Sequence, residues 1–148
     1  MTLPCERNIE ISELVREASL LHTEGYRMVT ATCVNASDGF ELLYHFDLDY
    51  ELLTFRVSAP SGTNVPSLTG VYPAAMLIEN EIADLFGITF MGLHPDFKKL
   101  LLLAQDAPYA PQYARGTAPP LEVTPITRPR PDRFSIASNA LSKATCAV

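Results

Sequence analysis

The stretch FELLYHFD, residues 40–47, decides how this chain begins to fold. Every second side chain is large and apolar, and these four share one face: Phe40, Leu42, Tyr44 and Phe46. The other face carries Glu41, Leu43, His45 and Asp47. A period of two is the pattern of a β-strand with one buried face. The stretch therefore predicts a central strand whose apolar side packs into a core.

Short turns connect this strand to a neighbour on each side. Before it, YRMVTATCVN (26–35) is rich in β-branched residues and leads into a turn whose Asp38-Gly39 pair suits a hairpin. After it, the acidic turn DLDY leads into LLTFRVSA (52–59). The inward residues of that strand would be Leu53, Phe55 and Val57, and the outward ones Thr54 and Arg56. Three strands joined this way predict an antiparallel meander.

One helix is expected before the meander in the sequence, and a second helix is expected after it. Residues 9–24 repeat apolar residues at helical spacing, and Ser12 or Asn8 could cap the helix. After a loop with at most one helical turn at residues 65–68, a second helix is expected at 73–86, ended by Gly87 and followed by a short strand at 88–90. The pattern predicts an α+β fold: a three-stranded or larger antiparallel or mixed sheet packed by helices.

The C-terminal part of the chain has a different composition. Seven of the twelve prolines lie from Pro108 to Pro131. Residues 116–148 hold four basic and two acidic residues, a net charge of +2, whereas the whole chain carries −6. Such a segment favours extended conformations. We therefore expect a domain at residues 1–107 and an extended, proline-rich basic arm at 108–148.

Composition and spacing exclude several classes of function. The acidic balance, with a pI near 4.9, argues against broad nucleic-acid binding. Cys5, Cys33 and Cys146 form no C-x-x-C pair, so this chain alone cannot assemble an iron–sulfur cluster or a zinc site. Its three histidines form no recognised ligand pattern. No catalytic, cofactor-binding or metal-binding residue is therefore predicted.

The second helix, MLIENEIADLFG (76–87), carries Glu79, Glu81 and Asp84. Glu79 and Glu81 point about 200° apart on an ideal helix, so they cannot share one site. The acids could form a solvated helix face. However, the helix is apolar on most sides, which suggests burial on two faces, where acids must meet cations or backbone donors. The cations expected nearby are Lys98, Lys99 and Arg56, with others supplied by another subunit.

Together with the helix and strands before it, this region resembles the peripheral C-subunit family of respiratory complex I (NADH:quinone oxidoreductase). The likeness covers about residues 10–103. Four motifs carry the resemblance. They are a V-P-S loop at 65–67, a P-A-A helix start at 73–75, the pattern E-x-E-x-x-D-L-F-G-I at 79–88, and His94-Pro95-Asp96 followed by Lys98-Lys99. Asn80 replaces the family's arginine, and Leu93 is an extra residue before His94. These departures favour the branch found in energy-converting membrane-bound NiFe hydrogenases.

The resemblance implies a non-catalytic scaffold subunit, binding no cofactor, in a hydrogenase or NADH-quinone oxidoreductase type of complex. Its partners would be a large subunit and iron–sulfur subunits, which would hold the iron–sulfur clusters and, in a hydrogenase, the NiFe centre. It would be cytoplasmic and peripheral on the inner face of the cell membrane. The residues expected to bind partners are Glu79, Glu81, Asp84, His94, Lys98, Lys99, Arg128, Arg130 and Arg133.

Two alternatives remain at this stage. One is a free-standing adaptor whose proline- and arginine-rich tail is bound by another domain. The other is a small enzyme that uses Glu81, Asp84 and His94 as acid/base groups. The enzyme requires His94 and at least two acids to converge on one open pocket.

Overall fold

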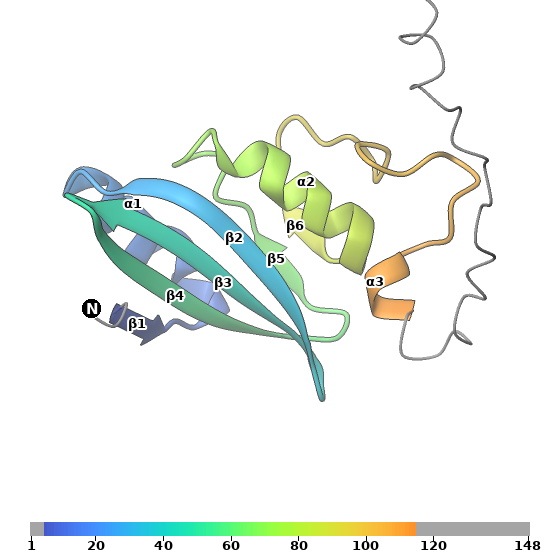
Figure 1. Ribbon diagram of the computed structural model, residues 1–148, viewed down its shortest axis with the longest axis horizontal. Coiled ribbons are helices and arrows are strands. Elements are labelled where there is room, and N and C mark those ends of the chain that lie inside the picture. Colours follow the sequence, from blue (N-terminus) through green and yellow to red (C-terminus); the bar gives the residue numbers. More distant parts are fainter. Residues whose placement is uncertain (1–4, 115–148) are drawn as a thin grey trace, which may run out of the picture. The chain divides into compact units, whose positions relative to one another are not determined.

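The sheet is built around the three predicted strands (Figure 1). The computed structural model describes residues 5–114. Strands β2 (Arg27–Ala36), β3 (Gly39–Leu48) and β4 (Glu51–Pro60) form an antiparallel meander. The alternating apolar residues of β3 and the three inward residues of β4 are all buried. Thr54, predicted to point outward, is only 5% exposed, because it packs beside His45 with its hydroxyl 2.9 Å from Nδ1.

A fourth strand makes the sheet mixed. β1 (Cys5–Asn8) pairs in parallel with β4, so the strand order is β1-β4-β3-β2. No sequence pattern indicates β1, because its four residues are polar or small and all are exposed. Side-chain contacts support the pairing, since Arg56 of β4 binds Glu6 of β1 and Glu41 of β3. The predicted α+β fold is confirmed.

The first helix lies behind the strands in the view of Figure 1. It begins as a 3₁₀ turn, η1 (Ile11–Glu13), and continues as α1 (Leu14–Thr23). Leu14, Ala18 and Leu21 are buried, as the apolar spacing predicted. The predicted side-chain cap was wrong: Ser12 lies inside the 3₁₀ turn, and neither part of the helix has a side-chain cap.

The segment between β4 and the second helix contains a short strand. A loop with at most one helical turn was predicted here, and it instead contains a strand, because β5 (Asn64–Pro66) pairs in parallel with β6 (Thr89–Met91). Val65 and its partner Phe90 are both buried. The acidic helix α2 (Ala75–Phe86) connects the two strands and ends at Gly87, which has a left-handed φ of 80°.

The remaining described chain is mostly irregular. Residues 92–110 form turns and loops before the short helix α3 (Pro111–Ala114). The predicted arm at 108–148, including Arg128, Arg130 and Arg133, lies almost wholly outside the described residues. None of the helices within residues 5–114 has the length and apolar character needed to cross a bilayer.

The hairpin between β2 and β3 allows a test of the fold. Gly39 has a φ of 141°, and a Cβ there would lie 2.5 Å from the Ala59 carbonyl oxygen and 2.5 Å from the Ser61 nitrogen. We expect Gly39→Ala to lower the free energy of unfolding by about 1–3 kcal/mol or more, because both the dihedral and the contact are strained. Urea unfolding of the full chain measures this change.

Gly70→Ala is the matched control. No atom lies within 4 Å of a Cβ at Gly70. Gly70→Ala should change the free energy of unfolding by no more than about 0.5 kcal/mol. Equal stability of the two variants would contradict the close packing at the hairpin.

Candidate functional site

The side chain of Glu79 points into the domain and is fully buried. The Ser67 hydroxyl donates to its Oε2 at 2.5 Å, and the Leu68 backbone N–H donates to Oε1 at 2.8 Å. Thr69 continues the network, with its hydroxyl 2.8 Å from that of Ser67. Glu79 therefore holds the turn that follows β5 through neutral donors, and no cation is needed.

Burial changes the ionisation of this site. It raises the pKa of Glu79 to about 7, although the hydrogen bonds from Ser67 and Leu68 oppose the change. The Tyr44 hydroxyl lies in the same interior and has no hydrogen-bond partner among the described residues. Burial, and then the charge of Glu79, raise the pKa of Tyr44 well above its usual value. The packing between α2 and the sheet thus favours the neutral form of both groups.

Two further side chains of α2 hold the loop that follows β6. We call residues 93–102 the anchored loop. Asn80 donates to the Pro95 carbonyl at 3.0 Å and accepts from the Phe97 N–H at 2.9 Å. Asp84, one turn further on, accepts from the Leu102 N–H at 2.7 Å through Oδ2, while its buried Oδ1 has no partner among the described residues. Both anchors are buried, so the loop backbone is tied to the helix at two points.

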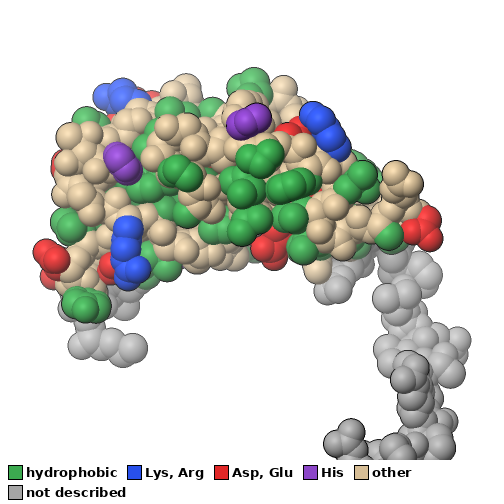
Figure 2. Space-filling model, turned by 90° about the horizontal axis from the view of Figure 1, so that it is seen from above, with side chains coloured by type: hydrophobic (Ala, Val, Ile, Leu, Met, Phe, Trp, Pro, Cys, Tyr) green, Lys and Arg blue, Asp and Glu red, His purple; other side chains and the backbone are tan. Residues whose placement is uncertain are grey.

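The outer side of the anchored loop is apolar and basic. Its exposed apolar residues are Phe97, Leu100 and Leu102, at 38%, 47% and 56%. Lys98 and Lys99 both have positive φ, and the Lys98 ammonium binds Asp96 Oδ2 at 2.7 Å. Figure 2 views the side on which α2 and this loop lie in Figure 1, and hydrophobic side chains gather there beside histidine and basic side chains.

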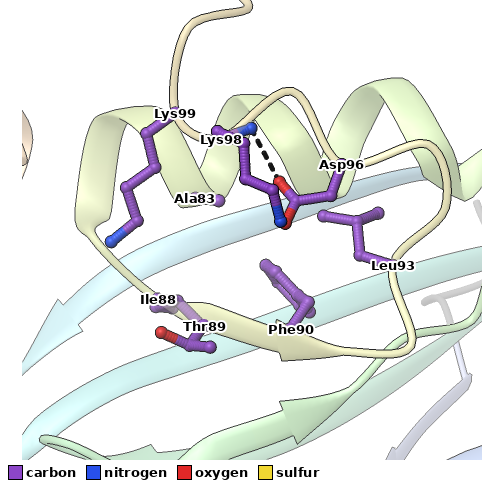
Figure 3. Close-up of a pocket in the computed structure, with 8 residues that line it drawn as sticks. All are labelled: Ala83, Ile88, Thr89, Phe90, Leu93, Asp96, Lys98 and Lys99. Carbon is purple, nitrogen blue, oxygen red and sulfur yellow. Dashed lines mark hydrogen bonds and ion pairs between the residues drawn. The ribbon is translucent and has the colours of Figure 1, made fainter.

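Beneath the lysines lies a hollow of about 230 Å³ (Figure 3). Ile88, Phe90 and Leu93 provide apolar walls, and Thr89 lies at one end. Figure 3 shows Lys98 joined to Asp96 on one side of the hollow and Lys99 on the other. The Lys99 ammonium lies 2.6 Å from the Tyr109 hydroxyl and 4.3 Å from the centre of its ring. The hollow is apolar inside, with charged groups around its rim.

The structure places the predicted site residues in two environments. Glu79 and Asp84 are buried and bind backbone of their own domain, whereas Glu81, His94 and Lys98 are exposed. Of the two kinds of partner expected for the buried acids, the cations were wrong, because Lys98, Lys99 and Arg56 bind other groups. The backbone donors were right, since the Leu68 and Leu102 N–H groups bind Glu79 and Asp84. A fully solvated acidic face is also excluded by the burial of Glu79 and Asp84. Contact of these residues with another protein stays a prediction.

Acid/base groups do not converge as the enzyme alternative requires. Glu81 lines a groove beside β2, Asp84 is buried against Leu102, and His94 is exposed in the anchored loop. Within residues 5–114, no group of three His, Cys, Asp or Glu side chains could hold a metal ion.

Sequence reasoning missed the structural role of Asn80. It stood out only as a departure from a family pattern. Its spacing of four residues from Asp84 placed both side chains on one helix face, which was the available signal.

Comparisons with known proteins agree on one family. A family model described as "Respiratory-chain NADH dehydrogenase, 30 Kd subunit" matches residues 6–116. The NADH-quinone oxidoreductase C-subunit of Phenylobacterium zucineum is 35% identical over 109 residues, which cover 68% of this chain and 48% of that protein. Its counterpart in Methylobacterium sp. (strain 4-46) is 38% identical over 104 residues, covering 63% and 47%. The chain spans about half the length of these curated relatives.

Two solved structures share the fold. One comes from the membrane-bound sulfane sulfur reductase, an archaeal respiratory membrane complex, with a TM-score of 0.62 and 20% identity over 74% of this chain and 68% of that chain. The other is a trypsin-resistant fragment of Nqo5, with a TM-score of 0.55 and 22% identity over 62% and 80%.

The buried carboxyl group predicts a pH dependence of stability. The pKa of Glu79 rises from 4.5 to about 7 on folding, so between these values the folded chain keeps a proton that the unfolded chain loses. The free energy of unfolding should therefore fall as pH rises, by up to about 1.4 kcal/mol per pH unit from this group. Glu79→Gln should remove this decline, which urea unfolding from pH 4.5 to 8 would measure. Glu81→Gln is the exposed control, and parallel curves for Glu79→Gln and wild type would contradict the prediction.

The anchors of the loop predict a local change in hydrogen exchange. Asn80→Ala removes the acceptor of the Phe97 N–H, and the loss of such a bond costs about 1–3 kcal/mol. We expect the Phe97 amide to exchange about tenfold faster or more. The Leu102 amide, held by Asp84, is the internal reference. Unchanged exchange at Phe97 would show that Asn80 does not hold the loop.

Proposed function

This chain belongs to the family of the 30 kDa subunit of respiratory-chain NADH dehydrogenase, and on that premise we propose that it is a non-catalytic docking subunit of a membrane-bound electron-transfer complex. The family named from the sequence motifs is thereby confirmed. The relatives are named as C-subunits of NADH-quinone oxidoreductase, which favours a complex of that type. Membership of the hydrogenase-associated branch stays a prediction.

The anchored loop is the observation that carries this proposal. Asn80 and Asp84 bind its backbone from below, so its outer side chains are held in place before any partner arrives. An ordered surface loses less conformational entropy on binding than a mobile one. The loop therefore suits lasting contact with another subunit.

The chemistry of the loop indicates what it would bind. Leu100 and Leu102 are about half exposed, and large exposed apolar groups of this kind mark interaction surfaces when they lie together. Lys98, at 79% side-chain exposure, and exposed His94 add a basic border. The complementary surface is an apolar patch with acidic residues at its edge. We propose that the large subunit of the complex carries this complementary surface.

The partner subunits, rather than this chain, would carry out electron transfer. The chain would bind no cofactor, while iron–sulfur clusters, and a NiFe centre in a hydrogenase, would lie in neighbouring chains. The chain would be cytoplasmic and held on the inner face of the cell membrane by its partners. Metal analysis of the purified chain tests the first point, since stoichiometric iron or nickel would contradict it.

Co-purification from native membranes tests the docking role. The tagged full chain should recover the large and iron–sulfur subunits, identified by mass spectrometry. The double variant Leu100→Asp and Leu102→Asp should recover at least about tenfold less, because charges replace the apolar contact. Both side chains are exposed, so the fold should tolerate the change.

Leu20→Asp is the matched control, because Leu20 of α1 is 50% exposed. It should recover the partners as well as wild type does. Recovery of no oxidoreductase subunit would overturn the docking role. Equal recovery by the loop variant and the control would overturn the assignment of the interface to the anchored loop.

A further inference from the structure

A series of polar contacts leads from the buried carboxyl group of Glu79 to the start of the anchored loop. Glu79 Oε2 lies 2.5 Å from the Ser67 hydroxyl, which in turn lies 2.8 Å from the Thr69 hydroxyl. The Thr69 hydroxyl is 3.3 Å from the carbonyl oxygen of Gly92, the residue directly before the anchored loop. Three contacts in series therefore join the interior of the domain to the backbone of an exposed residue.

The number of protons decides which of these contacts can be hydrogen bonds at the same time. Each contact needs one proton between its two oxygen atoms. The hydroxyl groups of Ser67 and Thr69 supply one proton each, and the Gly92 carbonyl supplies none. The third proton must come from Oε2 of Glu79, which is free to carry it because the Leu68 N–H binds Oε1. All three contacts are hydrogen bonds only when the carboxyl group is neutral.

In the neutral state the three bonds run in one direction. The carboxyl group of Glu79 donates to Ser67, the Ser67 hydroxyl donates to Thr69, and the Thr69 hydroxyl donates to the Gly92 carbonyl. Ser67 Oγ also accepts the Thr69 backbone N–H at 3.1 Å, which its second lone pair allows. Every polar atom of the series is then satisfied.

Ionisation of Glu79 leaves two protons for three contacts. The Ser67 hydroxyl must then donate to the carboxylate, so one of the other two contacts opens. The contact between Thr69 and Gly92 is the longest, and it is exposed, so water can take the place of the Thr69 hydroxyl. The Ser67 N–H binds the Met91 carbonyl at 2.9 Å in either state, which limits the change to the chain after Met91.

We propose that the protonation of Glu79 switches the contact between Thr69 and Gly92, and thereby fastens or releases the start of the anchored loop. The neutral carboxyl group fastens it, and the carboxylate releases it. Burial raises the pKa of Glu79 to about 7, so the switch works near neutral pH. A rise in pH through this value releases the loop.

The groups that face Glu79 from the sheet stay neutral while it titrates. They are Tyr44 of β3 and, beside Tyr44, Cys33 of β2. Burial raises the pKa of both, that of Cys33 to about 12. On α2 itself, Asp84 binds the Leu102 N–H of the anchored loop instead. Within residues 5–114, Glu79 takes part in no ion pair.

Other neighbouring elements add no charge to this series. β5 and β6 contain no titratable residue. On α1, Arg16 and Glu17 bind each other, and His22 packs against the ring of Tyr72. His94 is exposed in the anchored loop two residues after Gly92, so its own ionisation needs a control.

Carbon-13 NMR of the full chain tests the switch. The side-chain carboxyl carbon of Glu79 reports its ionisation, and the carbonyl carbon of Gly92 reports the hydrogen bond that it accepts. From pH 5 to 9 both signals should shift with one midpoint, near pH 7. In Glu79→Gln the amide group donates at every pH, so the Gly92 signal should keep its low-pH position. A Gly92 signal that does not follow Glu79 in the wild type would overturn the inference.

The hydroxyl of Thr69 can be removed with little change of shape. In Thr69→Val the carboxyl carbon of Glu79 should still titrate, but the Gly92 signal should no longer follow it. Thr69→Ser keeps a hydroxyl and should keep the coupled shift. His94→Gln should keep it as well. A coupled shift that persists in Thr69→Val, or disappears in His94→Gln, would show that Thr69 does not carry the effect.

The switch acts at the border of the surface that the docking role assigns to a partner. However, the inference needs only the contacts of this domain, and its test uses the full chain alone. If Gly92 follows Glu79 but no oxidoreductase subunit co-purifies, only the docking role is wrong. If the subunits co-purify but Gly92 does not follow Glu79, only the switch is wrong.

Discussion

The carboxyl group of Glu79 lies inside the domain, where it binds the Ser67 hydroxyl and the Leu68 backbone N–H. These bonds fix the turn after β5 against α2. β5 pairs with β6, and the anchored loop begins directly after β6. The position of the loop therefore depends on a polar contact in the core. Burial raises the pKa of Glu79 to about 7, which lets the neutral group remain among apolar neighbours.

Local patterns in the sequence were enough to predict the meander, the two main helices and the core face of β3. β1 and β5 could not be found in this way, because each is short and pairs with a distant segment. The burial of Glu79 and Asp84 followed from their apolar surroundings. Backbone donors were among the expected partners, but the particular N–H groups could not be identified, because every non-proline residue carries one. The lysines nearby in sequence were a misleading signal.

Helix α2 presents different chemistry on two sides. On one side, Asn80 and Asp84 bind loop backbone and order a basic, apolar surface. On another, Ile78, Glu81 and Leu85 face the edge of β2. The E-x-E-x-x-D spacing thus places Glu79 and Asp84 inside the domain and leaves Glu81 exposed.

The hydrogen bonds of Asn80 have a consequence for behaviour in salt. An amide holds the loop through uncharged, partly buried hydrogen bonds of 3.0 and 2.9 Å, which dissolved ions hardly affect. The Lys98 ammonium on the outer side is exposed, and on the proposed docking role its attraction to a partner would be screened beyond about 8 Å at physiological ionic strength. On the proposed docking role, high salt would therefore weaken binding to a partner while leaving the loop folded. Under that proposal, association and local folding respond to different solution conditions.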